Sequence, residues 1–131
     1  MPSYAPDELI ETLWPQLGGL RFTPGYYTST SWDGDAKAAS AGIDLSAAFG
    51  LPAGIKAIAC RMRVKDETAA VAAALSDVVG TPRNGVGVYT QIANVENVGG
   101  GIVPCDASGD VYFSLSGELD AVHIDIVGYW S

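Results

Sequence analysis

The chain has 131 residues, of which 48% are hydrophobic, so one domain can bury a sizeable core without needing disulfides or a metal ion for folding. Seven basic residues against fifteen acidic ones give a formal net charge of −8, which argues against a phosphate-binding surface and therefore against nucleic acid as a direct partner. Sixteen glycines, with prolines, punctuate short apolar runs, and this pattern favours an all-β architecture over a helical one.

Nothing in the sequence predicts a membrane partner. The chain has no run of eighteen or more apolar residues, and its first residues, MPSYAPDELIETL, lack the basic and apolar regions of a secretory signal. We therefore expect synthesis in the cytoplasm and a soluble product.

Residues 1–24 are predicted to form an arm with one short helix. Asp7 and Glu8 would lie in its first turn, and Pro15 would end it after about two turns. A helix this short is marginal in water, so its apolar face must dock on the domain, on a neighbouring subunit or on a larger assembly, and these alternatives stay open. The candidate assembly contacts are Leu9, Ile10, Leu13 and Trp14. The glycine-containing stretch Pro15–Pro24 is predicted to be a linker or loop.

The first half of the domain is predicted to contain three strands. Aromatic and β-branched residues indicate a strand over Gly25–Trp32, and Asp33, Gly34 and Asp35 then form a turn. A second strand is expected over Ala41–Leu45, a loop over Phe49–Gly54 and a third strand over Ile55–Lys65. The third strand should present one apolar face, made of Ile58, Cys60, Met62 and Val64.

The next segment is ambiguous. Alanine-rich residues 67–79 favour a helix by intrinsic propensity, but a strand or mixed structure is equally open at this point. Thr81–Gly85 is a clear turn signal because it contains Pro-Arg-Asn-Gly. Val86–Val95 should form a strand and Asn97–Gly101 a glycine-rich connection.

The last third has the clearest pattern. Val111, Phe113 and Leu115 alternate with polar or aromatic residues, and the same period of two continues through Val122, Ile124 and Ile126. Short turn segments, Asp106–Asp110 and Ser116–Asp120, precede and separate these strands. The last third, Gly100–Trp130, is therefore predicted to form three consecutive strands in a meander.

Candidate chemistry is sparse. His123, the only histidine, shares a strand face with Asp125, but side chains two residues apart on a strand lie roughly 7 Å apart, too far for a hydrogen bond. We expect no enzyme activity. The turns at Asp33–Asp35 and Asp106–Asp110 could offer oxygens to Ca²⁺, although turn formation explains both, and no metal or other cofactor is predicted.

Two further residue types leave alternatives open. Cys60 and Cys105 form no CxxC motif; they are interpreted as small buried residues, with a bridge as the alternative. Among the aromatic residues, Trp32 and Trp130 are candidates for stacking on a sugar ligand. The alternative is that these rings lie in the core or in a subunit interface.

Several motifs carry a resemblance to a known group of proteins. They are Ile102–Asp106, Gly109–Tyr112 and Ile126–Trp130, with Ser31–Asp35, Ile43–Ser46 and Leu51–Ala57 upstream. The pattern, over roughly residues 28–131, resembles the small β-sandwich proteins of tailed-bacteriophage particles: head-decoration proteins, head fibres and tail-fibre modules. The resemblance implies an antiparallel, jelly-roll-like β-sandwich over residues 25–131, following the arm of residues 1–24. It also favours a strand within residues 67–79.

The function implied by this resemblance is structural. We expect a non-enzymatic protein of the virion, made in the host cytoplasm, that decorates or stabilises the capsid or forms part of a head or tail fibre. Its partners would be the major capsid protein or other virion proteins. It would itself be a homo-oligomer, with a trimer implied by the resemblance, fastened through residues 1–24. The alternative function is a carbohydrate- or receptor-binding module of a phage fibre.

Overall fold

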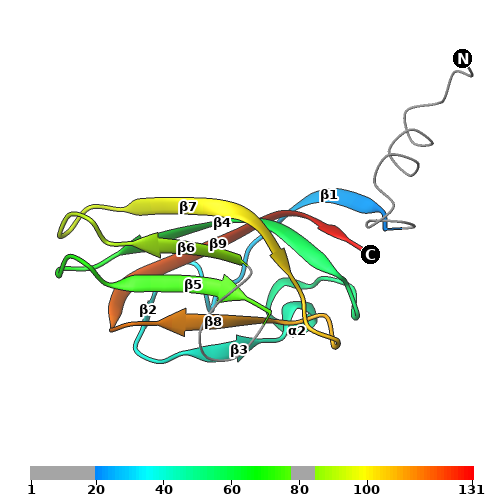
Figure 1. The fold of residues 1–131 in the computed structure, drawn as a ribbon, viewed down its shortest axis with the longest axis horizontal. Coiled ribbons are helices and arrows are strands. Elements are labelled where there is room, and N and C mark those ends of the chain that lie inside the picture. The colour runs from blue at the N-terminus through cyan, green and yellow to red at the C-terminus, as the bar shows by residue number, and fades with distance from the viewer. Residues whose placement is uncertain (1–19, 78–84) are drawn as a thin grey trace, which may run out of the picture.

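The computed structural model describes residues 20–77 and 85–131, which form two antiparallel sheets and a short helix (Figure 1). One sheet has five strands in the order β1-β9-β4-β7, with β2 also paired to β9; the other has four in the order β3-β8-β5-β6. The all-β prediction is therefore confirmed. The meander predicted for the last third is wrong, because β8 lies in the four-stranded sheet whereas β7 and β9 lie in the five-stranded sheet, with β4 between them. The helix expected before Pro15 and most of the turn Thr81–Gly85 lie outside the described residues.

The bounds of the elements follow the chain. They are β1 Phe22–Tyr27, β2 Asp35–Lys37, β3 Ala41–Ile43, α2 Leu45–Phe49, β4 Ala57–Lys65, β5 Ala72–Ser76, β6 Gly85–Tyr89, β7 Asn97–Pro104, β8 Val111–Leu115 and β9 Leu119–Trp130. Among the described residues, no helix has both the length and the apolar character needed to cross a membrane.

Buried side chains from both sheets form one hydrophobic core. Its largest fully buried members are Phe113, Leu45, Ile55, Ile58, Met62, Leu75, Leu119, Ile124 and Ile126. The apolar face predicted for the third strand is confirmed, since Ile58, Cys60, Met62 and Val64 are all buried. The same holds for the inward residues predicted on the last strand, because Val122, Ile124 and Ile126 are buried as well.

Strand β9 contains an irregularity that moves the side chains after it to the opposite face of the sheet. Its register against β4 shifts between Ala59 and Cys60, which pair with Gly128 and Ile126. The extra residue, Val127, is exposed. Strict alternation from Ile126 would point Trp130 into the core, but a bulge of one residue moves the following residues to the opposite face.

The first strand ends earlier than predicted. It ends at Tyr27, so the expected strand over Gly25–Trp32 is wrong in its second half. Trp32 lies in a turn, where its backbone N–H donates to the carbonyl oxygen of Ser29 at 3.0 Å. The turn lets the indole ring pack edge-on against Phe113, with ring centroids 4.7 Å apart.

The loop predicted over Phe49–Gly54 is wrong at its start, because helix α2 covers Leu45–Phe49. Asp44 caps the helix: one side-chain oxygen accepts hydrogen bonds from the backbone N–H groups of Ser46 and Ala47 at 3.1 and 3.2 Å. Gly50 ends it with a φ of +73°, a conformation that favours glycine. The helix forms because both caps are present and because Leu45 and Phe49 reach the core.

Strand β5 resolves the ambiguity of residues 67–79 in favour of a strand over Ala72–Ser76. Alanine has a high helix propensity, but pairing with both β6 and β8 satisfies the backbone of this segment instead. Tertiary pairing overrides the local preference. The strand that follows is shorter than the predicted Val86–Val95, since β6 ends at Tyr89.

The glycine-rich connection predicted over Asn97–Gly101 is wrong, because these residues are the first part of β7. A Cβ atom at Gly99 would lie 2.6 Å from Val88 Cγ2, and one at Gly101 would lie 2.9 Å from Val86 Cγ1. The glycines therefore mark a close approach of β6 to β7, not a loop.

Candidate functional site on the outer face of the five-stranded sheet

Two rows of apolar residues lie across the outer face of the five-stranded sheet. In β4, Ala57 and Ala59 alternate with the buried Ile58 and Cys60, so the two alanines point outward. Residues directly opposite in neighbouring strands share a face. The two rows, called the apolar patch below, are Phe22, Trp130, Ala57 and Pro104, then Pro24, Gly128, Ala59 and Ile102.

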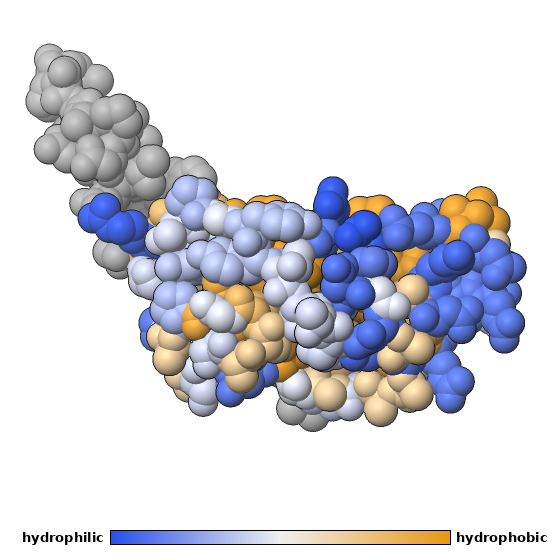
Figure 2. All heavy atoms as spheres, turned by 180° about the vertical axis from the view of Figure 1, so that it is seen from behind, coloured by the Kyte–Doolittle hydropathy of each residue, from blue (hydrophilic) through white to orange (hydrophobic). Residues whose placement is uncertain are grey.

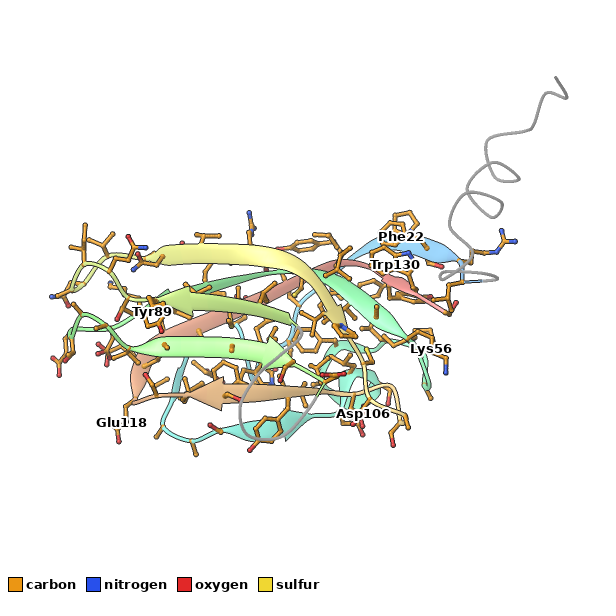
Figure 3. All side chains as sticks on the ribbon, in the orientation of Figure 1. Phe22, Lys56, Tyr89, Asp106, Glu118 and Trp130 are labelled. Atoms are coloured by element: carbon orange, nitrogen blue, oxygen red, sulfur yellow. The ribbon has the colours of Figure 1, made fainter. Side chains whose placement is uncertain are left out.

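Two aromatic rings stand on the patch at the end where β1 begins (Figure 3). The ring centroids of Phe22 and Trp130 lie 4.6 Å apart at an interplanar angle of 50°. The Phe22 ring lies over Gly128, where a Cβ atom would come within 2.2 Å of it. Because Gly128 has no side chain, the ring can lie against the sheet. Phe22 nevertheless stays 42% exposed and Ile102 stays 60% exposed.

Beyond the patch the same face carries a buried carboxylate. The side chain of Asp125 is only 1% exposed although it points away from the core. Its Oδ1 accepts a hydrogen bond from the Tyr26 hydroxyl at 3.0 Å, and its Oδ2 accepts from Arg61 Nη2 at 2.9 Å. Arg63 Nε lies 3.3 Å from Oδ2 without a hydrogen-bond geometry, so that contact is one between charges. These four residues are called the Asp125 cluster below.

The electrostatics of the cluster keep Asp125 ionised. Burial by itself raises the pKa of this carboxyl, but the hydrogen bonds from Arg61 and Tyr26 and the positive charge of both arginines outweigh it, and the pKa lies below its ordinary value. The hydrogen bond to Asp125 raises the pKa of the Tyr26 hydroxyl. The cluster is thus a stable ion pair that fixes β1 and β4 to β9.

His123 does not join this cluster. Its Nδ1 lies 2.5 Å from Asp33 Oδ1, in the turn before β2. The structure therefore pairs His123 with a carboxylate 90 residues earlier in the chain, while Asp125 is held by Tyr26 and the arginines.

The two tryptophans proposed for ligand stacking lie in different environments. Trp130 stands on the apolar patch, partly exposed beside Phe22. Trp32 is 7% exposed in the core, and Lys37 Nζ covers its ring at 4.1 Å from the centroid. The structure does not bring the two rings together into one platform, and Trp32 offers no open face to a ligand. The predicted assembly contacts Leu9, Ile10, Leu13 and Trp14 lie outside the described residues.

The carboxylates of the turn Asp106–Asp110, one of the two turns considered for Ca²⁺, accept hydrogen bonds from backbone N–H groups. Asp106 Oδ1 accepts from the backbone N–H groups of Ser108 and Asp110, both at 2.9 Å, and Asp110 Oδ1 accepts from that of Leu45 at 3.3 Å. Across residues 20–77 and 85–131, no group of three or more His, Cys, Asp or Glu side chains could hold a metal ion.

Both cysteines are free thiols, with Cys60 buried and Cys105 partly buried. Burial raises the pKa of each thiol to about 12, and at Cys105 the nearby carboxylates Asp106 and Asp110 add to this effect. Neither thiol is therefore an activated nucleophile.

Sequence reasoning found Trp130 but missed the residues around it. Phe22 and Ile102 belong to strands far apart in the sequence, and only the pairing register brings them to one face. The signal available in the sequence was the outward row Ala57, Ala59 and Arg61, which runs from apolar to charged along β4.

Comparison with known proteins identifies no relative. No family model matches the chain, and neither the curated proteins nor the solved structures contain a significant match.

Proposed function

We propose that this protein is a non-enzymatic structural component of a tailed-bacteriophage particle, with a jelly-roll-like β-sandwich fold. It would decorate or stabilise the capsid, or form part of a head or tail fibre, in contact with the major capsid protein or other virion proteins. The resemblance in the turn and strand pattern between Ser31 and Trp130 motivates the proposal. One structural observation supports it further: an exposed apolar tip suited to assembly.

The tip lies at the connection between β6 and β7 and consists of Tyr89, Ile92, Val95 and Val98, all of them exposed. Figure 2 shows a small hydrophobic group at the upper corner of this end of the domain, opposite the end where β1 begins, beside a larger hydrophilic surface. Single exposed apolar residues are ordinary, whereas a group of them marks a contact surface. The tip, here called the β6–β7 tip, is where we place the contact between subunits or with the particle.

The oligomer belongs to the same proposal. A closed homo-oligomer buries repeated copies of one contact, whereas an open contact would give filaments. A trimer is the form that the resemblance implies. Light scattering on the purified chain should give the mass of a trimer, and Ile92→Glu should reduce it to that of a monomer because an unpaired charge would be buried in the contact. A monodisperse monomer of the unaltered chain at micromolar concentration would refute the oligomer.

Location on a particle is tested directly. Particles purified by density gradient from a culture that produces the protein are labelled with antibodies raised against it and imaged, and their protein content is measured by mass spectrometry. The protein should sediment with the particles in a fixed copy number per capsid protein. Absence of the protein from every particle fraction would refute the proposal.

Binding of a carbohydrate or receptor by a phage fibre is the second candidate, favoured by the partly exposed Phe22–Trp130 ring pair. Amphipathic rings suit stacking on sugars. A glycan array should then show binding that Trp130→Ala abolishes. Absence of binding to any host-surface glycan would exclude this candidate.

A further inference from the structure

The large apolar side chains that stay exposed in the described part of the chain gather at two places. One place is the β6–β7 tip. The other is the apolar patch, which carries Phe22 and Ile102 and adjoins Tyr26 along β1 and Val127 along β9. The domain therefore presents two separate apolar surfaces, and groups of exposed apolar residues mark contact surfaces.

The tip of a domain cannot cover the patch of the same domain. Val98 of the tip and Ile102 of the patch lie on one strand, β7, and point to the same face because they are four residues apart. Four residues of strand span about 13 Å. Every residue of β7 pairs with β4, so the sheet holds the two surfaces at a fixed separation. A surface that covers the patch must therefore come from another molecule.

Negative charge borders the tip. The connection between β6 and β7 lies against the end of β4, where the backbone N–H of Asn94 donates to the carbonyl oxygen of Asp66 at 2.7 Å. Arg63 lies 3.8 Å from Glu96, but its guanidinium also faces the buried Asp125. The exposed charged side chains around this junction are one lysine and three carboxylates: Lys65, Glu67, Glu96 and Asp120.

Positive charge borders the patch. Arg21 and Lys56 are exposed and adjoin its first row, and Lys56 stands at this end of the domain (Figure 3). Arg61 follows the second row on the same face and is 53% exposed. Asp125 beside it is only 1% exposed. The exposed carboxylate at this border is that of Asp106, so the three basic residues leave the border positive.

A ring of three subunits needs two different surfaces on each subunit. A contact between two copies of one surface joins only two subunits, whereas a closed ring repeats one contact between unlike surfaces. Two tips in contact would bring carboxylates together, and two patches in contact would bring basic side chains together. A tip on a patch places opposite charges against each other, which favours this pairing over the other two.

We propose that the β6–β7 tip of each subunit packs on the apolar patch of the next subunit, so that three identical contacts close the ring. The inference rests on the trimer proposed above and adds to it the second half of the contact. Ile92 and Val95 of one subunit lie against Phe22 and Ile102 of its neighbour, with Lys56 and Arg61 of the neighbour facing the carboxylates around the tip.

Photo-crosslinking of the full chain tests the pairing of the two surfaces. Ile92 or, in a separate chain, Val95 is replaced by the photo-reactive residue benzoylphenylalanine. Unlabelled and ¹⁵N-labelled chains are mixed in equal amounts, unfolded in urea and refolded together before irradiation. Mass spectrometry should find crosslinks from these positions to Ala57, Ile102 or Trp130, joining light to heavy chains as often as chains of one isotope form. Crosslinks from tip to tip, crosslinks confined to single chains, or no crosslinks would each overturn the proposal.

A matched set of variants tests the patch by light scattering. Ile102 on the patch and Ile92 on the tip are 60% and 63% exposed, so Ile102→Glu should reduce the trimer to a monomer as Ile92→Glu does, because each buries an unpaired charge in the contact. The control Ala41→Glu, at an exposed position of β3 in the other sheet, should keep the mass of the trimer. Circular dichroism confirms that all three variants are folded.

The outcomes separate this inference from the proposed function. If Ile102→Glu remains a trimer, the patch is not part of the contact, and the inference fails while the trimer stands. If the unaltered chain is a dimer with the same crosslinks, the ring of three is wrong. If the unaltered chain is a monomer, the trimer itself is refuted, and the inference with it. None of these results depends on whether the protein is found on a phage particle.

Discussion

Replacing Asp125 with asparagine tests whether the Asp125 cluster stabilises the sheet. The variant keeps the size of the side chain and one acceptor oxygen but removes the negative charge, which leaves Arg61 without its counter-ion and Arg63 with only the more distant Glu96, at 3.8 Å. A hydrogen bond to a charged group contributes about 1.5–3 kcal/mol. Arg61 is half exposed, so water screens part of this interaction. We expect the free energy of unfolding to fall by about 2 kcal/mol.

Urea denaturation followed by circular dichroism measures this loss. With an m-value of about 2 kcal/mol/M, the midpoint should fall by about 1 M. The matched control is Asp35→Asn, because Asp35 is 51% exposed and lies 4.0 Å from Lys37. Exposed ion pairs of this kind contribute less than about 1 kcal/mol. If both variants shift the midpoint equally, the reasoning about the buried carboxylate is refuted.

The pH dependence provides an independent check on Asp125. Its pKa in the folded protein lies below the ordinary value, so the folded state binds this proton less readily than the unfolded state. The stabilisation is complete above the unfolded pKa of about 3.9 and is lost as the pH falls through the lower folded pKa. The stability difference between the unaltered chain and Asp125→Asn should therefore be constant near neutral pH and shrink below about pH 4. A difference that grows on acidification would contradict this assignment.

Three further predictions concern the core and its border. Gly99→Ala should lower the free energy of unfolding by about 1–3 kcal/mol because its Cβ would crowd β6. The control Gly87→Ala should change the free energy of unfolding little, because a Cβ there would meet its nearest neighbour at 3.7 Å. Equal urea midpoints for the two variants would contradict the close approach of β6 and β7. With thiol pKa values of about 12, Cys60 and Cys105 should resist iodoacetamide at pH 8 until urea unfolds the protein, as intact mass will show; rapid labelling of the folded protein would refute their burial. Trp32→Ala should lower the free energy of unfolding by about 3–5 kcal/mol, measured by thermal or urea denaturation. If it lowered the free energy of unfolding less than the same substitution at the exposed Tyr89, the Trp32 ring would not be part of the core.

The sequence by itself determined which residues of the well-patterned strands enter the core. Val122, Ile124 and Ile126 are buried as their period of two predicts, because successive side chains of a strand point to opposite faces whatever its partners are. The caps of α2 were also present in the sequence as Asp44 and Gly50. That helix was missed because a single turn is too short to show a periodic pattern.

Pairing between distant strands decided the rest, including the site. The bulge at Val127 turns Trp130 outward, and the register of β1 places Phe22 beside it. The glycines of β7 resemble a loop in the sequence, yet they are strand residues because β6 approaches them. Local alternation tells which residues share a face of one strand, but it contains no information about which strands become neighbours or where an extra residue is inserted. The apolar patch and the Asp125 cluster therefore exist only in the folded sheet.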